Sequence, residues 1–123
     1  ASTTREGPLY GMVLDERERA RIWWGHDNHI WIEWLSDAPL PFYLDQPKKT
    51  VLQSRSPIRG ISFYPNRDDV ILLATEDSVF ALEIDARGTQ NFQPLYRGIQ
   101  PSFARIEDDI YILDQGALAR IEL

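Results

Sequence analysis

The stretch Val70-Ile71-Leu72-Leu73-Ala74, followed by Val79-Phe80-Ala81-Leu82-Glu83-Ile84, decides the fold of this chain. Both runs are short, apolar and rich in β-branched or aromatic residues, a composition typical of buried strands. Residues 75–78 separate them and carry Thr, Glu, Asp and Ser, which favour a tight turn. The two runs therefore predict a β-hairpin inside a larger antiparallel sheet.

Flanking segments extend this hairpin to four strands. Residues 61–64 form an apolar run that ends in the turn-forming residues 65–69, Pro-Asn-Arg-Asp-Asp. A second turn signal at residues 85–88 precedes a weaker strand at residues 92–96. Four short antiparallel strands in this order form one predicted structural unit.

The same unit recurs before and after this stretch. Residues 57–63 align without gaps on residues 8–14, and Ile71-Leu72-Leu73-Ala74 aligns on Ile22-Trp23-Trp24-Gly25, at a constant offset of 49. At an offset of 39, the same four residues align on Ile110-Tyr111-Ile112-Leu113. Repeats of this length, built from short strands, predict a propeller-type or other repetitive β architecture.

We therefore expect an all-β domain over residues 8–123, preceded by a flexible polar segment at residues 1–7. Its repeats span about residues 8–56, 57–98 and 99–123, and the third is incomplete because it holds only three strands. The fourth strand of the first repeat is expected near residues 50–53, after a proline-containing connection.

Alternate residues of a strand point to opposite faces of its sheet. In residues 79–84 both faces are largely apolar, so both are expected to be covered. In the first repeat one face combines Trp31 with Glu33, and in the third repeat Arg120 and Glu122 lie on the opposite face. This pattern predicts a stack with the second repeat in the middle, and it nominates these four residues as an interface with another copy.

The segments Ile61-Ser62-Phe63-Tyr64-Pro65-Asn66, Val70-Ile71-Leu72-Leu73 and Ser78-Val79-Phe80-Ala81-Leu82-Glu83-Ile84-Asp85 resemble blades of TolB-like and WD-repeat propellers. Those families place glycine where this chain has Arg67, and the Trp-Asp dipeptide of WD repeats is missing. Asn28-His29-Ile30-Trp31-Ile32 also resembles the C-terminal repeats of bacterial PEGA-domain surface proteins. The resemblance covers about residues 8–123 and implies a propeller fold and an extracytoplasmic or cell-surface location.

Three blades do not close a ring, because propellers have about four to eight blades. Three arrangements follow from the sequence. The chain is part of a longer propeller, it forms a dimer that closes a six-bladed ring, or it is an open stack. An open stack leaves strand edges and apolar faces exposed, which soluble proteins generally avoid. The first two are therefore preferred, and in the dimer Glu33 of one copy lies near Arg120 or Glu122 of the other.

Composition excludes several classes of function. The chain has 123 residues, 43% of them hydrophobic and 26% charged, which fits one globular domain. Its net charge of −6 disfavours nucleic acid as a partner. Cysteine is absent, which excludes disulfides and thiolate metal sites. No apolar run reaches the ~18 residues of a membrane-spanning helix, and the polar start does not resemble a signal peptide.

The sequence contains no strong catalytic motif, and we expect neither catalytic residues nor a cofactor. His26, Asp27 and His29 form a cluster of metal-ligand types, but a polar hairpin turn is the better interpretation, so no metal site is predicted. No serine lies in a Gly-x-Ser-x-Gly elbow. The adjacent carboxylates at 68–69 and 108–109 fall at turn positions and are read as turn residues.

Binding residues are expected on turns and among the tryptophans. Turns between the second and third strands and loops between repeats should lie on one side of the molecule, where function is usually found. The predicted binding residues there are His26, Asp27, His29, Glu76, Asp77 and Asp114. Trp23, Trp24 and Trp31 are expected to fill cores, whereas Trp34 aligns with Glu83 and is the candidate for an exposed aromatic.

These features predict a non-catalytic binding or scaffolding module that contacts a protein or a glycan through loops on one face and associates with itself. The alternative is a hydrolase or lyase with an acidic central site. Carboxylates that converge with His26 on a central pocket would favour the enzyme, and dispersed turns would favour the binding module.

Overall fold

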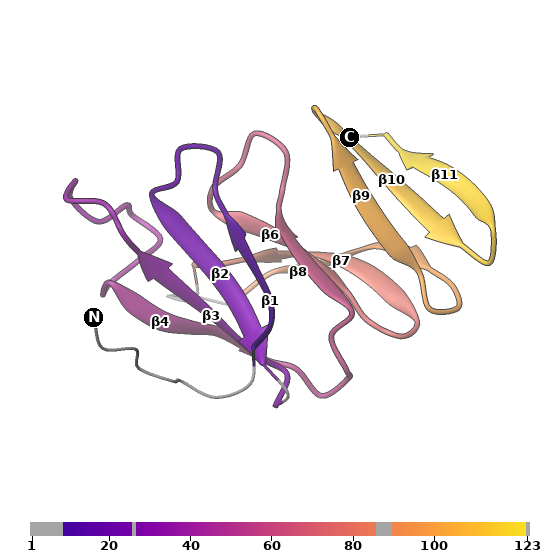
Figure 1. The fold of residues 1–123 in the computed structure, drawn as a ribbon, viewed down its shortest axis with the longest axis horizontal. Helices are drawn as coiled ribbons and strands as arrows, with labels where there is room; N and C mark the ends of the chain where they lie inside the picture. The colour runs from indigo at the N-terminus through magenta and orange to yellow at the C-terminus, as the bar shows by residue number, and fades with distance from the viewer. Residues whose placement is uncertain (1–8, 26, 86–89, 123) are drawn as a thin grey trace, which may run out of the picture.

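The computed structural model describes residues 9–25, 27–85 and 90–122, and every strand in this part of the chain belongs to one of three antiparallel sheets (Figure 1). The first sheet contains β1 (Leu9–Leu14), β2 (Ala20–Gly25), β3 (His29–Trp34) and β4 (Lys48–Gln53). The second contains β5 (Gly60–Phe63), β6 (Val70–Ala74), β7 (Ser78–Glu83) and β8 (Phe92–Arg97). The third contains β9 (Ser102–Ile106), β10 (Asp109–Asp114) and β11 (Ala117–Ile121).

Consecutive strands pair with each other in all three sheets, so each sheet is a meander of hairpins. The all-β prediction and the short antiparallel strands are confirmed, as are the three strands of the last unit. Strand β4 begins two residues before the predicted segment at residues 50–53. The predicted segment 1–7, His26, most of the predicted turn at 85–88 and Leu123 lie outside the described residues.

The three sheets stack face to face, with the second sheet in the middle (Figure 1). One apolar core lies between the first and second sheets and includes Ile22, Ile32, Ile71 and Leu82. A smaller core between the second and third sheets includes Leu72, Val79, Ile110 and Ile112. Strand β6 contributes to both cores and is buried along its whole length, as expected for a strand covered on two faces.

Both faces of the middle unit are therefore covered, as its sequence predicts. Each core is built from alternate residues of the facing strands, in keeping with the pleat of a β-sheet. In β3 the buried residues are Ile30, Ile32 and Trp34, and the alternate side chains point away from the second sheet.

The turn between β5 and β6 forms where the sequence predicts it. Asn66 adopts the left-handed conformation with φ of 60°, which asparagine tolerates better than most residues. In the equivalent turn of the first sheet, the buried carboxylate of Asp15 accepts hydrogen bonds from the backbone N–H groups of Arg19 and Ala20, at 2.6 and 3.2 Å. Both hydrogen bonds stabilise the turn between β1 and β2.

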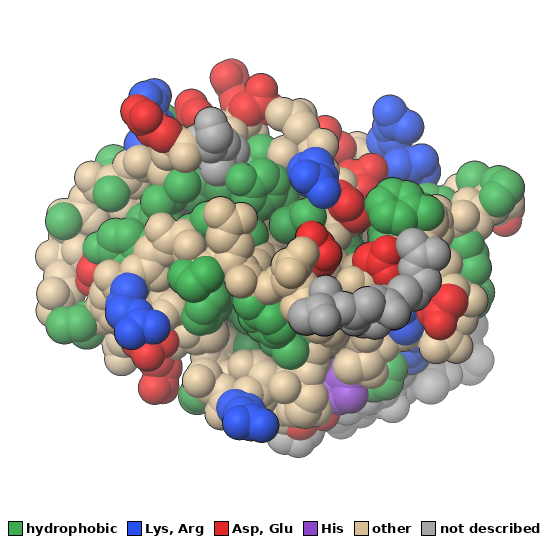
Figure 2. All heavy atoms as spheres, turned by 180° about the vertical axis from the view of Figure 1, so that it is seen from behind, with side chains coloured by type: hydrophobic (Ala, Val, Ile, Leu, Met, Phe, Trp, Pro, Cys, Tyr) green, Lys and Arg blue, Asp and Glu red, His purple; other side chains and the backbone are tan. Residues whose placement is uncertain are grey.

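Figure 2 shows charged side chains of both signs along the upper rim of the molecule, where the first turn of each sheet lies in Figure 1. Ion pairs cross between sheets in this region. Arg105 of β9 pairs with Glu16 of the β1–β2 turn, so side chains of the first and third sheets meet there. Among the described residues there is no helix with the length and hydrophobicity that crossing a bilayer requires.

Two predictions about the tryptophans are wrong. Trp34 is buried, with 8% of its surface exposed, and its indole N–H donates to the carbonyl of Ala38 at 2.9 Å. Trp23 and Trp31, expected in a core, are half-exposed on the outer face of the first sheet. Trp24 is buried as expected. For Trp23 and Trp31 the alignment misled because both faces of the middle repeat are covered, whereas the first sheet has one covered face. Trp34 lies on that covered face with Ile30 and Ile32.

Candidate functional site

The outer face of the first sheet carries a row of aromatic side chains. Trp23 and Trp31 are paired across β2 and β3, and their rings stack with centroids 6.4 Å apart and planes at 17°. The imidazole of His29, two residues before Trp31 on the same strand, stacks on that indole at 4.3 Å and 5°. The parity of the strands forces this arrangement, since residues two apart share a face.

Cationic side chains complete this row. The Arg21 guanidinium lies 4.8 Å from the ring centre of Trp23, and the ammonium of Lys48 lies 5.5 and 5.4 Å from Trp23 and Trp31. Arg21 also pairs with Glu33, with Nη2 and Oε1 2.6 Å apart. Each cation–ring contact at an exposed site contributes about 0.5–1 kcal/mol. The row is thus an ordered surface in which the ring faces of Trp23 and Trp31 contact neighbouring groups.

Apolar side chains from β1 extend the same face. Met12 and Leu14 pair with Trp23 and Arg21 across the sheet and are exposed. Together, Met12, Leu14, Trp23, Trp31, Arg21, Glu33 and Lys48 form a mixed apolar and charged surface that we call end face A.

The outer face of the third sheet is the opposite end of the stack. Leu113 of β10 and Leu118 of β11 are directly paired, and they are 50% and 69% exposed. Ile106 of β9 is also exposed, and Arg120 and Glu122 form a loose ion pair at 3.6 Å beside these residues. We call the surface formed by Ile106, Leu113, Leu118, Arg120 and Glu122 end face B. The predicted interface residues thus lie on two opposite outer faces, Trp31 and Glu33 on A and Arg120 and Glu122 on B.

The predicted binding residues on turns have a different role. Asp27 accepts a hydrogen bond from the backbone N–H of His29 at 3.2 Å, and Nε2 of His29 lies 2.7 Å from Oγ1 of Thr50 on β4. His26 lies outside the described residues. Asp27 and His29 therefore shape the β2–β3 hairpin and join it to β4.

The turn between β6 and β7 is tied to the loop that leads to the third sheet. The carbonyls of Glu76 and Asp77 accept hydrogen bonds from the backbone N–H groups of Gln100 and Gly98, at 2.6 and 2.9 Å. Oδ1 of Asp77 accepts hydrogen bonds from the hydroxyls of Thr75 and Ser78, at 3.2 and 3.1 Å. Glu76 and Asp77 thus hold a connection between sheets.

Asp114 joins the second and third sheets. Its Oδ2 accepts a hydrogen bond from the hydroxyl of Tyr96 on β8 at 2.6 Å, and its Oδ1 accepts one from the backbone N–H of Ile99 at 3.3 Å. The hydrogen bond to Asp114 raises the pKa of the Tyr96 hydroxyl, because proton loss from the phenol would remove the donor. A carboxylate in this geometry stabilises the stack.

The turns that carry these residues lie on one side of the molecule, along the lower side in Figure 1, as the sequence predicts. The acidic side chains themselves do not converge on a common point, because each is bonded to its own turn or to the next sheet. Within residues 9–25, 27–85 and 90–122, no three His, Asp or Glu side chains are grouped closely enough to hold a metal ion.

The sequence nominated Trp31 and Glu33 of end face A as an interface but missed the rest of that face. Its signal was present: His29, Trp31 and Glu33 alternate along one strand, and Arg21 and Trp23 alternate along the strand before it. Only the register of β2 against β3 brings the two sets together. The chain matches no protein-family profile, no curated protein and no solved structure.

Proposed function

We propose that this chain is a non-catalytic binding or scaffolding module that associates with a second copy through end faces A and B. The observation that carries the proposal is the apolar exposure at both ends of the stack. Met12, Leu14, Leu113 and Leu118 are each at least 41% exposed, whereas the two faces of the middle sheet are covered. Contiguous exposed apolar surface on a stacked sheet is typical of an interaction site.

The three sheets support a propeller-type interpretation in which each sheet is one blade. Each is a meander, each stacks on the next, and side chains of the first and third sheets meet at the charged rim through Arg105 and Glu16. A second copy would then continue the stack, with face A of one copy against face B of the other. Repeated head-to-tail contacts form a closed ring when the rotations from each sheet to the next add up to a full turn. A longer chain that supplies the neighbouring blades would use the same faces.

The occupant that we favour is protein rather than glycan. Sugar rings stack on open aromatic faces, whereas Trp31 is stacked on His29 and both indoles carry a cation above the ring. The alternative of a hydrolase or lyase requires carboxylates that converge on a site. Asp27, Asp77 and Asp114 are instead engaged separately in the connections that they stabilise.

Light scattering at micromolar concentration tests the proposal. We expect a dimer, and we expect Leu118→Lys to shift the protein to monomer, since it places a charge in the middle of face B. Ile99→Lys is the matched control, because Ile99 is 60% exposed but lies in the loop between the second and third sheets. A stable monomer of the unmodified chain would refute self-association.

Charge reversal tests which faces meet. Glu33→Arg and Arg120→Glu should each weaken the dimer, because each places like charges across the A–B contact. The double variant should recover part of the loss, which the proportion of dimer in sedimentation experiments would measure. Without recovery in the double variant, Glu33 and Arg120 do not face each other.

A further inference from the structure

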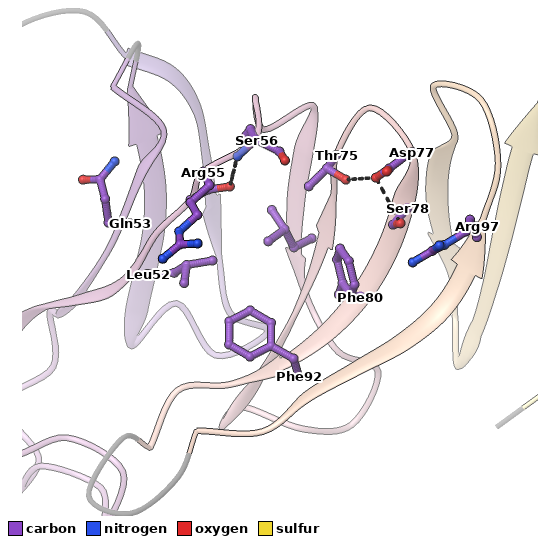
Figure 3. Close-up of a pocket in the computed structure, with 12 residues that line it drawn as sticks. Leu52, Gln53, Arg55, Ser56, Thr75, Asp77, Ser78, Phe80, Phe92 and Arg97 are labelled. Atoms are coloured by element: carbon purple, nitrogen blue, oxygen red, sulfur yellow. Dashed lines mark hydrogen bonds between the residues drawn. The ribbon is translucent and has the colours of Figure 1, made fainter.

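A groove opens between the first and second sheets along their outermost strands, β4 and β8 (Figure 3). Its volume is about 430 Å³. It lies between the sheets at the edge of their common core, because Leu73 belongs to that core and also lines the groove. The residues that line it are Leu52, Gln53, Ser54, Arg55, Ser56, Leu73, Thr75, Asp77, Ser78, Phe80, Phe92 and Arg97.

The middle of the groove is apolar. Leu52 from β4 and Phe80 from β7 are only partly buried, and Phe92 at the start of β8 is exposed (Figure 3). Figure 2 shows apolar side chains gathered near the centre of the same side of the molecule. An apolar ligand body of modest size would cover Leu52, Phe80 and Phe92 and remove them from water, which is favourable.

The two ends of the groove are cationic. Figure 3 places Arg55 and Arg97 at opposite ends, with Phe80 and Phe92 between them. Among the described residues, neither guanidinium has an ion pair, a hydrogen bond or a ring contact, whereas Arg19, Arg21, Arg67, Arg105 and Arg120 are all paired with carboxylates. Two unpaired arginines in an acidic protein mark a place where an anion would be attracted locally.

One carboxylate lines the same groove and would oppose an anion. Oδ1 of Asp77 is directed into its own turn by the hydroxyls of Thr75 and Ser78 (Figure 3). It does not pair with Arg97. Its charge nevertheless weakens the attraction of an anion to that end of the groove. Removing this charge should therefore strengthen anion binding, the opposite of removing an arginine.

We propose that this groove binds a linear molecule with an apolar middle and a carboxylate at each end. The guanidinium is the side chain best suited to a carboxylate, because it can donate two parallel hydrogen bonds. One arginine at each end then sets the spacing of the two carboxylates, and Leu52, Phe80 and Phe92 contact the chain between them. This site is separate from end faces A and B, so it does not depend on self-association.

Suberate, the linear eight-carbon dicarboxylate, is the probe, and octane-1,8-diol is its uncharged counterpart. In a titration followed by amide NMR, suberate should shift the signals of residues 52–56, 75–80 and 92–97. Octanediol should bind at least about tenfold more weakly, a difference of ~1.4 kcal/mol. Equal binding of the diol, or no shifts in these segments, would overturn the proposal.

Substitutions of Arg55 and Arg97 test whether each arginine binds one carboxylate of suberate. Arg55→Gln and Arg97→Gln should each weaken suberate binding about tenfold, since each removes a charged hydrogen-bond donor. Arg17→Gln is the matched control, because Arg17 is also exposed and, within the part of the chain that the structure describes, forms no ion pair, but it lies in the β1–β2 turn. If it weakens binding as much as the groove variants, the effect is one of net charge and the site is not the groove.

Two further variants separate an effect on ligand binding from an effect on the stability of the fold. Asp77→Asn keeps an acceptor for the hydroxyls of Thr75 and Ser78 but removes the opposing charge, so it should strengthen suberate binding. Phe80→Ala should weaken suberate and octanediol alike. A dispersed amide spectrum for each variant confirms that it is folded, and an Asp77→Asn variant that binds suberate more weakly than the parent protein would contradict the assignment.

Discussion

Arg19 of the β1–β2 turn and Asp68 of the β5–β6 turn lie 49 residues apart, and their side chains form an ion pair across the first two sheets with Nη2 and Oδ2 3.1 Å apart. The guanidinium of Arg19 also lies 5.4 Å from the ring centre of Trp34 and 3.8 Å from the buried carboxylate of Asp15. One arginine therefore links a turn, a core tryptophan and the next sheet.

Removing the two partners should have unequal effects. Asp68→Asn should cost less than about 1 kcal/mol of unfolding free energy, because the pair is partly exposed. Arg19→Met should cost about 1–3 kcal/mol, because it also leaves the buried Asp15 without a nearby cation. Urea denaturation measures both. Arg67→Met, which breaks an exposed pair within one turn, is the control. Equal losses for Arg19→Met and Arg67→Met would show that the contacts of Arg19 with Asp15 and Trp34 contribute nothing.

Gly11 on β1 allows Trp24 to pack against the backbone. A methyl group at this position would overlap two ring carbons of Trp24, closer than any real contact. Gly11→Ala should therefore destabilise the protein by about 1–3 kcal/mol, the usual cost of overpacking a core.

Gly60 is the matched control for this substitution, because it lies 49 residues later at the equivalent position of β5. A methyl group there would meet only Phe103, at an ordinary 3.8 Å. Gly60→Ala should be neutral or slightly stabilising, since alanine lowers the entropy of the unfolded chain. Chemical denaturation of both variants measures the difference, and similar losses at the two positions would contradict the packing argument.

Tyr43 makes the free energy of unfolding depend on pH in the alkaline range. Burial raises the pKa of its hydroxyl from 10.0 to about 12, with further increases from Asp68 and Asp15. Below pH 10 the folded and unfolded states both keep the proton. Above it the unfolded state loses the proton first, so the free energy of unfolding falls as pH rises from 10.0 to about 12. The loss should be about 2 kcal/mol.

Tyr43→Phe isolates this contribution, because it removes the ionisable group and keeps the ring. The parent protein and the variant should differ in the slope of stability against pH between about pH 9 and about pH 12, measured by urea denaturation. Parallel curves over this range would mean that Tyr43 titrates alike in both states.

The hydrogen bond between Tyr96 and Asp114 should control how firmly the third sheet is attached. Tyr96→Phe removes the donor and leaves Asp114 with the weaker contact to the N–H of Ile99. We expect amide exchange in β9 and β10 to become about fivefold faster while exchange in β2 and β3 is unchanged. Tyr111→Phe, on the outer face of the third sheet, is the control. Faster exchange in all sheets would instead indicate a global loss of stability.

The sequence predicted local features well where the physical reason is local. Residues 65–69 predict the turn before β6, and alternation along residues 79–84 predicts that both faces are covered. It failed for Trp34, Trp23 and Trp31, because aligning one repeat on another does not show which face of a terminal sheet has a neighbour. The contacts of Asp77 and Asp114 with other segments were not predicted either, since the carbonyl of Asp77 accepts a hydrogen bond from the N–H of Gly98 and the carboxylate of Asp114 accepts one from the hydroxyl of Tyr96.

The sequence by itself determined the strands, their antiparallel order and the middle position of the second unit, because these follow from hydrophobic alternation and turn chemistry within each repeat. The tertiary structure alone decided which side chains face outward at the two ends of the stack and which acidic residues connect one segment to another by hydrogen bonds. It also decided where a groove remains between β4 and β8. Those features depend on which sheet faces which and on how far the facing strands are separated, and no short stretch of sequence encodes either.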